Sequence, residues 1–198
     1  MEVKSLDGAP AGPGESPLEL DERAVALQER ARRFAEGVLM PLEEEAERRG
    51  GRLPDDVVSD VKREAIAARY GVTVGEVFVG NGSDEVLAHT FQALLKHDAP
   101  LLFPDITYSF YPVYSGLYGV SYVEVPLDAA MRVQIADYRR PCSAILLANP
   151  NAPTGTALPR AAIEELVTEH PDQLVVVDEA YVDFGGESAV PLVARHDN

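Results

Sequence analysis

Two short apolar runs constrain the fold of this chain more than any other feature. They lie at 144–148 and 174–177, and the segment 160–169 between them has the pattern of an amphipathic helix. Short apolar runs joined by a helix are typical of buried parallel strands in a β-α-β unit. Ligands of such sheets bind at the carboxyl ends of the strands. In this sequence those ends carry the polar stretches NPNAPTG (149–155) and DEAY (178–181), so we expect the functional site there.

The sequence upstream of these runs continues the alternation of strands and helices. Strands are predicted at 77–79, 100–103 and 121–125, and helices at 84–96 and 108–118. Together with the first two strands, this pattern predicts an α/β domain with a largely parallel sheet and flanking helices.

The N-terminal third of the chain has a different character. Residues 1–17 are rich in Gly and Pro and predict a disordered lead-in. Residues 18–64 have helical patterns only, with Pro41 expected to end or kink the first helix and Gly71 expected to stop the last. The expected division is therefore a lead-in, a helical segment and an α/β domain at 65–198.

Composition excludes several classes of function. The net charge of −16 argues against nucleic acids and anionic membranes as partners. No apolar run approaches the roughly 20 residues of a membrane span. Cys142 is the only cysteine, which excludes a disulfide framework and a zinc cluster built on cysteines. We expect a cytoplasmic protein.

A glycine-rich turn precedes the helix predicted at 84–96. Its sequence is GNGSDE (80–85), and the glycines allow a tight turn before the first helical amides. Such amides lack intrahelical partners and lie at the positive end of the helix dipole, so they can hold a phosphate. The alternative is an ordinary helix start, capped by Ser83 or Asp84.

Aromatic and acidic side chains follow two of the strands. Tyr108 comes just after the strand at 100–103, where its ring could stack on a flat ligand or pack in the core. Tyr111 is expected only to pack. Asp178 could pair with the protonated nitrogen of a pyridine ring. Magnesium is another candidate partner, but that site needs the phosphate loop G-x-x-x-x-G-K-[ST], which this sequence lacks, so no metal site is assigned. Tyr181 could donate a hydrogen bond beside Asp178, or cap the strand.

Five motifs give the chain a resemblance to a known family. They are ARYGV, VFVGNGSDEVL, LFPDITYSFYPVY, NPNAPTG and VVVDEAYVDFG, all within 65–198. This part resembles the large domain of the fold-type I pyridoxal-phosphate aminotransferases, and within them the histidinol-phosphate aminotransferases. The resemblance implies pyridoxal 5'-phosphate as cofactor, an amino-acid-like phosphate ester and a 2-oxo acid as substrates, and a homodimer. The implied reaction is transamination between histidinol phosphate and 2-oxoglutarate in histidine biosynthesis.

The resemblance also implies roles for particular residues. Those implied to bind the cofactor are Ser83, Asp84 and Glu85 at its phosphate, Tyr108 on its ring, Asp178 at its nitrogen, and Tyr181 and Asn151 at its phenolic oxygen. In the family motif a second Asn makes the last of these bonds. Here that position is Ala152, so either Asn151 replaces it or the bond is lost.

The family's catalytic lysine, which forms a Schiff base with the cofactor, has no counterpart in this sequence. The lysines are Lys4, Lys62 and Lys96, and none follows Asp178. We therefore assign no catalytic residue and expect this chain alone to be inactive.

The helical segment 18–64 resembles instead the first helices of an acyl-CoA dehydrogenase. One alternative is therefore a non-enzymatic chimeric or truncated product, and another is an acyl-CoA dehydrogenase fragment, which would bind flavin.

Overall fold

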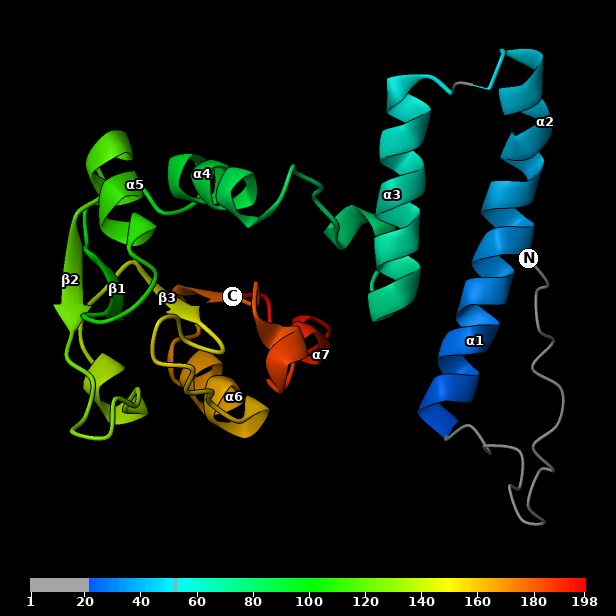
Figure 1. Ribbon diagram of the computed structural model, residues 1–198. Helices are drawn as coiled ribbons and strands as arrows, with labels where there is room; N and C mark the ends of the chain where they lie inside the picture. Colours follow the sequence, from blue (N-terminus) through cyan, green and yellow to red (C-terminus); the bar gives the residue numbers. More distant parts are fainter. Residues whose placement is uncertain (1–21, 52) are drawn as a thin grey trace, which may run out of the picture. The chain divides into compact units, whose positions relative to one another are not determined.

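The computed structural model describes residues 22–51 and 53–198, and the lead-in predicted at 1–17 lies outside them. The chain divides into two compact units, Met1–Val77 and Phe78–Asn198. The first unit contains only helices among its described residues, and the second contains the sheet (Figure 1).

A long helical run opens the described part of the first unit. It consists of α1 (Glu22–Phe34), a π-helical turn (Ala35–Leu39) and α2 (Met40–Arg48), without a break between them. Pro41 was expected to end or kink the helix. The helix continues through Pro41, so it does not end there. Proline lacks the N–H that would continue the ladder of hydrogen bonds, and the wider π-helical turn ends at Leu39, two residues before it.

The second helix of this unit, α3 (Asp55–Tyr70), packs against α1 and runs antiparallel to it (Figure 1). It stops at Gly71 as predicted, because Gly71 adopts a left-handed conformation with φ of 74° and donates its N–H to the carbonyl of Ala67. Residues 77–79 were predicted as a strand, and this is wrong. They are not assigned to a strand, because they pair with none of the described strands.

The second unit is built on a parallel four-stranded sheet. Its strands are β1 (Leu101–Pro104), β2 (Tyr122–Val125), β3 (Ala144–Ala148) and β4 (Leu174–Asp178), in the order β2-β1-β3-β4. All three pairings are parallel. This sheet confirms the predicted α/β fold class.

Helices cover both faces of this sheet (Figure 1). One face packs against α4 (Ser83–Ala93) and α5 (Phe110–Tyr118). The other packs against a 3-10 helix (Ile135–Tyr138), α6 (Arg160–Glu169) and α7 (Val190–Val193).

Side-chain alternation explains how both faces become buried. Along β1, Leu101 and Phe103 belong to one core cluster and Leu102 to the other. Along β3, Leu146 belongs to the first cluster and Leu147 to the second. Because β1 and β3 are apolar at every position, each of these two strands contributes to both cores.

The parallel pairing brings the carboxyl ends of β1, β3 and β4 to one edge. Ala148, the last residue of β3, lies opposite Asp178, the last residue of β4.

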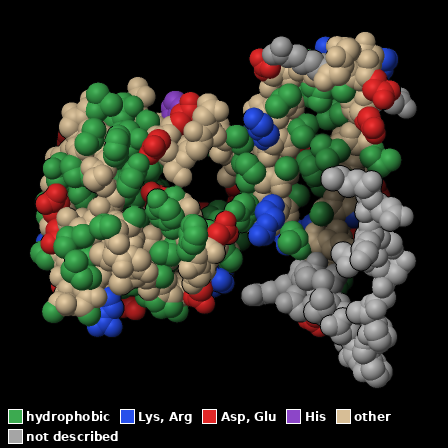
Figure 2. Space-filling view, in the orientation of Figure 1, with side chains coloured by type: hydrophobic (Ala, Val, Ile, Leu, Met, Phe, Trp, Pro, Cys, Tyr) green, Lys and Arg blue, Asp and Glu red, His purple; other side chains and the backbone are tan. Residues whose placement is uncertain are grey.

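Acidic side chains are spread over the visible surface rather than gathered in one patch (Figure 2). Among the described residues, no helix is both long and apolar enough to cross a membrane.

Candidate functional site

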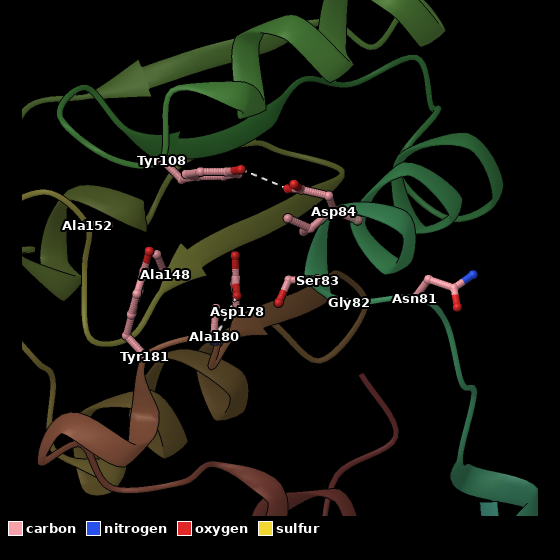
Figure 3. A pocket seen from close by; sticks show the side chains of 11 residues that line it. Asn81, Gly82, Ser83, Asp84, Tyr108, Ala148, Ala152, Asp178, Ala180 and Tyr181 are labelled. Atoms are coloured by element: carbon pink, nitrogen blue, oxygen red, sulfur yellow. Dashed lines mark hydrogen bonds between the residues drawn. The ribbon is translucent and has the colours of Figure 1, made fainter. Parts of the chain in front are cut away.

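A cavity of about 270 Å³ lies at this carboxyl edge, within the second unit. It is formed by the start of α4, the loop between β1 and α5, and the ends of β3 and β4 (Figure 3). Its lining consists of Asn81, Gly82, Ser83, Asp84, Leu87, Tyr108, Ala148, Ala152, Asp178, Ala180 and Tyr181. The fold thus gathers at one place five of the seven predicted binding residues, leaving Glu85 and Asn151 outside the lining.

The first turn of α4 presents free backbone donors to this cavity. Gly82 precedes the helix with φ of 91°, a conformation that favours glycine. The first N–H to bond into the helix is that of Val86, which donates to the carbonyl of Gly82 at 3.3 Å. The amides of Ser83, Asp84 and Glu85 therefore have no acceptor among the described residues. Free amides at the positive end of a helix are suited to bind a phosphate.

Glu85 fixes the turn before α4. Its carboxylate accepts a hydrogen bond from the backbone N–H of Asn81, two residues before the helix begins. The side chain is thereby directed back to the turn, and it is absent from the lining of the cavity. The backbone N–H of Glu85 therefore remains available to a phosphate, whereas its side chain does not.

Tyr108 forms one wall of the cavity, and its ring is held in place. Its hydroxyl donates to Oδ1 of Asp84 at 2.7 Å (Figure 3). The ring centroids of Tyr108 and Tyr111 lie 5.6 Å apart in an edge-on arrangement, with an interplanar angle of 79°. The hydrogen bond to Asp84 is the main cause that raises the pKa of Tyr108 to about 12. Tyr108 is therefore a neutral hydrogen-bond donor at physiological pH.

Asp178 extends from the end of β4 toward the middle of the cavity (Figure 3). Two donors fix its carboxylate. Oδ2 accepts from the hydroxyl of Tyr111 at 2.9 Å, and Oδ1 accepts from the backbone N–H of Ala180 at 3.0 Å. From the sequence, Tyr111 is expected only to pack, because no local pattern shows that α5 brings its hydroxyl to the end of β4. Tyr181 is half-exposed and lines the same cavity.

Asn151 lies beside the cavity but not in its lining. Its Oδ1 accepts from the hydroxyl of Thr107 at 2.8 Å, and its Nδ2 donates to the carbonyl of Ile106 at 2.9 Å and to Oγ1 of Thr154 at 3.1 Å. The side chain is 97% buried in this network, with a relative exposure of 3%. Asn151 therefore joins two loops of the edge, and Ala152 occupies the position that faces the cavity.

No magnesium site is expected at Asp178, because the sequence lacks the phosphate loop that such a site needs. Across residues 22–51 and 53–198, no three His, Cys, Asp or Glu side chains are grouped so that they could hold a metal ion. The donors that contact the carboxylate of Asp178 are a phenol and a backbone amide.

The chain is similar in sequence and in fold to known proteins. The chain matches the family model for aminotransferase class I and II over residues 14–198. Histidinol-phosphate aminotransferase 1 of Bradyrhizobium diazoefficiens is 63% identical over 190 residues, which cover 96% of this chain and 54% of that protein. Histidinol-phosphate aminotransferase 2 of Rhizobium meliloti is 69% identical over 147 residues, or 74% of this chain and 42% of that protein. The chain spans about half the length of the curated relatives it matches.

A solved structure shows the same fold. It is the histidinol-phosphate aminotransferase from Sinorhizobium meliloti in complex with pyridoxal-5'-phosphate, with a TM-score of 0.58 at 21% identity. The match covers 80% of this chain and 41% of that chain.

The family match also bears on the helical segment 18–64. Because it begins at residue 14 and runs to residue 198, it includes that segment. An origin of the segment in an acyl-CoA dehydrogenase, and with it a flavin site, is therefore not favoured. Over nearly its whole length, this chain belongs to the class I and II aminotransferase family.

Proposed function

We propose that this chain forms the cofactor-binding part of a pyridoxal-phosphate-dependent aminotransferase. One observation carries the proposal: the start of α4, the ring of Tyr108 and the carboxylate of Asp178 line a single cavity. These groups differ in chemistry, and each is suited to a different part of the same cofactor.

The residues fit pyridoxal phosphate part by part. The free amides of Ser83 and Asp84 would hold the phosphate, and the flat ring of Tyr108 would lie against the pyridine ring. The carboxylate of Asp178 would hold a proton on the ring nitrogen, because a nearby anion raises the pKa of that nitrogen. When bound, the cofactor supplies a cationic ring that withdraws electrons from the substrate. Tyr181 would donate a hydrogen bond to the phenolic oxygen.

The carboxylate of Asp84 does not conflict with this arrangement. It would repel a phosphate if it faced one, but it accepts the hydroxyl proton of Tyr108 in a hydrogen bond of 2.7 Å. Asp84 would therefore act on the ring of the cofactor through Tyr108, and on the phosphate through its backbone N–H.

The proposed parent reaction transfers an amino group between histidinol phosphate and 2-oxoglutarate, in accordance with the names of the relatives. The cavity lining contains no lysine. Lys96 lies near the C-terminal end of α5, where its Nζ is 3.9 Å from the position that a Cβ on Gly119 would take. We therefore expect the chain alone to bind the cofactor without a covalent bond to lysine, and not to transaminate.

Titration with pyridoxal phosphate, followed by absorbance, tests the proposal. We expect saturable binding that is weaker for Asp178→Ala and weaker for pyridoxal, which lacks the phosphate. After treatment with borohydride, the mass of the protein should be unchanged. An absence of saturable binding would contradict the proposed function, and a stoichiometric adduct at one lysine would contradict the expected lack of a covalent bond.

We also propose that the protein is cytoplasmic and forms a homodimer. On α5, Phe110, Val113 and Leu117 are exposed apolar side chains at positions i, i+3 and i+7, so they share one helix face. Exposed apolar stripes of this kind are typical of association surfaces. Light scattering should give the mass of a dimer, and a stable monomer at micromolar concentration would exclude it.

A further inference from the structure

The fixed orientation of the Asp178 carboxylate depends on Tyr111, a residue outside the cavity lining. Tyr111 lies on the first turn of α5, and its side chain has no exposed surface. Its hydroxyl crosses from the helix layer to the end of β4, where it donates to Oδ2 of Asp178 at 2.9 Å. A buried phenol with a charged acceptor forms a stronger hydrogen bond than a neutral pair does.

The ring of Tyr111 is itself rigidly held. Its neighbours are Phe91, Phe103 and Tyr108, with ring centroids at 6.3, 5.8 and 5.6 Å. Phe91 and Phe103 are fully buried, so the hydroxyl has a defined position. Tyr111 therefore contacts two sides of the cavity at once, through its ring at Tyr108 and through its hydroxyl at Asp178.

The hydrogen-bond count at Asp178 leaves room for a ligand. Each carboxylate oxygen can accept two hydrogen bonds. Oδ2 accepts one from Tyr111 and Oδ1 one from the N–H of Ala180, so each oxygen has one acceptor site left. Burial, followed by the charge of Asp178, raises the pKa of Tyr111 well above its ordinary value, so this donor keeps its proton throughout the pH range of a folded protein.

We propose that Tyr111 is a positioning residue, which holds the carboxylate of Asp178 in the orientation that pairs with the ring nitrogen of the cofactor. This inference rests on the proposed function and deepens it. Without the hydroxyl of Tyr111, the carboxylate would be held by the Ala180 amide alone and would have to be ordered when the cofactor binds. The affinity for the cofactor would fall, and the loss would depend on the ring nitrogen.

Tyr111→Phe removes the hydroxyl and keeps the ring. Tyr138→Phe is the matched control, because Tyr138 is equally buried and its hydroxyl has no hydrogen-bond partner among the described residues. Each variant is titrated with pyridoxal phosphate and with the analogue in which a C–H replaces the ring nitrogen. The ratio of the two dissociation constants is compared within each variant. A partial loss of folded protein changes both constants equally and cancels in that ratio.

For Tyr111→Phe we expect the dissociation constant of pyridoxal phosphate to rise about tenfold, as is common when a partner of a ligand-binding group is removed. The constant for the analogue should change by less than about twofold, and Tyr138→Phe should change neither. In an Asp178→Asn background, Tyr111→Phe should add less than about twofold, because the two residues act as one unit.

Equal losses for both compounds would overturn the inference, since they would indicate a general effect on the cavity. So would unchanged binding of pyridoxal phosphate by Tyr111→Phe. If the wild-type chain bound neither compound, the proposed function itself would fail and the inference with it. The wild-type titration therefore separates a failure of the proposed function from a failure of the inference alone.

Discussion

The network around Asn151 yields a prediction that separates a structural role from a role in binding. Asn151→Ala removes three hydrogen bonds, to Thr107, Ile106 and Thr154. Each contributes about 1 kcal/mol net, or about 3 kcal/mol together. Water can reach the three partners in part, because their residues are only half-buried. We therefore expect the free energy of unfolding to fall by about 2 kcal/mol.

Urea unfolding followed by circular dichroism measures this change. With a slope of about 1.5 kcal/mol per molar urea, the midpoint should fall by about 1.3 M. Asn81→Ala is the control for the same chemical change, because Asn81 is exposed and its side chain makes no hydrogen bond with described residues. Its free energy of unfolding should change by less than about 0.5 kcal/mol.

The same variant tests whether Asn151 touches the cofactor. Because Asn151 does not line the cavity, the affinity of the folded Asn151→Ala protein for pyridoxal phosphate should change by less than about threefold. The opposite result, an unchanged midpoint with affinity lost more than about tenfold, would refute the reasoning. It would mean that the amide of Asn151 faces the ligand in solution, as one reading of the sequence had it.

Two further predictions concern the two ends of the cavity. Gly82→Ala places a side chain on a residue with φ of 91°, and the resulting backbone strain, not a lack of space, displaces the start of α4. Binding of pyridoxal phosphate should therefore weaken severalfold, whereas binding of pyridoxal, which lacks the phosphate, should not. Gly116→Ala, within α5 and also without a neighbour for its Cβ, is the control and should leave both unchanged. Ultraviolet titration should show Tyr108 ionising near pH 12, and Asp84→Ala should return it toward its ordinary value of 10.0. Because the pKa is raised in the folded state, the stability from this pair is complete below about pH 10 and is lost as the pH rises toward 12, so an unchanged alkaline unfolding profile in Asp84→Ala would contradict the prediction.

The sequence by itself determined the strands and helices whose pattern is local. β3 at Ala144–Ala148 and α6 at Arg160–Glu169 have the predicted bounds, because a bounded apolar run and an amphipathic helix are each written in consecutive residues. It also determined that Asp178 and Tyr108 lie at one edge, since parallel strands bring their carboxyl ends together.

The tertiary structure decided what pairs across the chain. Residues 77–79 have the composition of a strand, but a strand also needs a neighbour, and no local pattern supplies one. The direction of the Asn151 side chain depends on Thr107 and Ile106, which are more than 40 residues away in sequence. Tyr111 and Asp178 are separated by 67 residues, and only the packing of α5 over the sheet turns a buried tyrosine into the donor that fixes the central carboxylate.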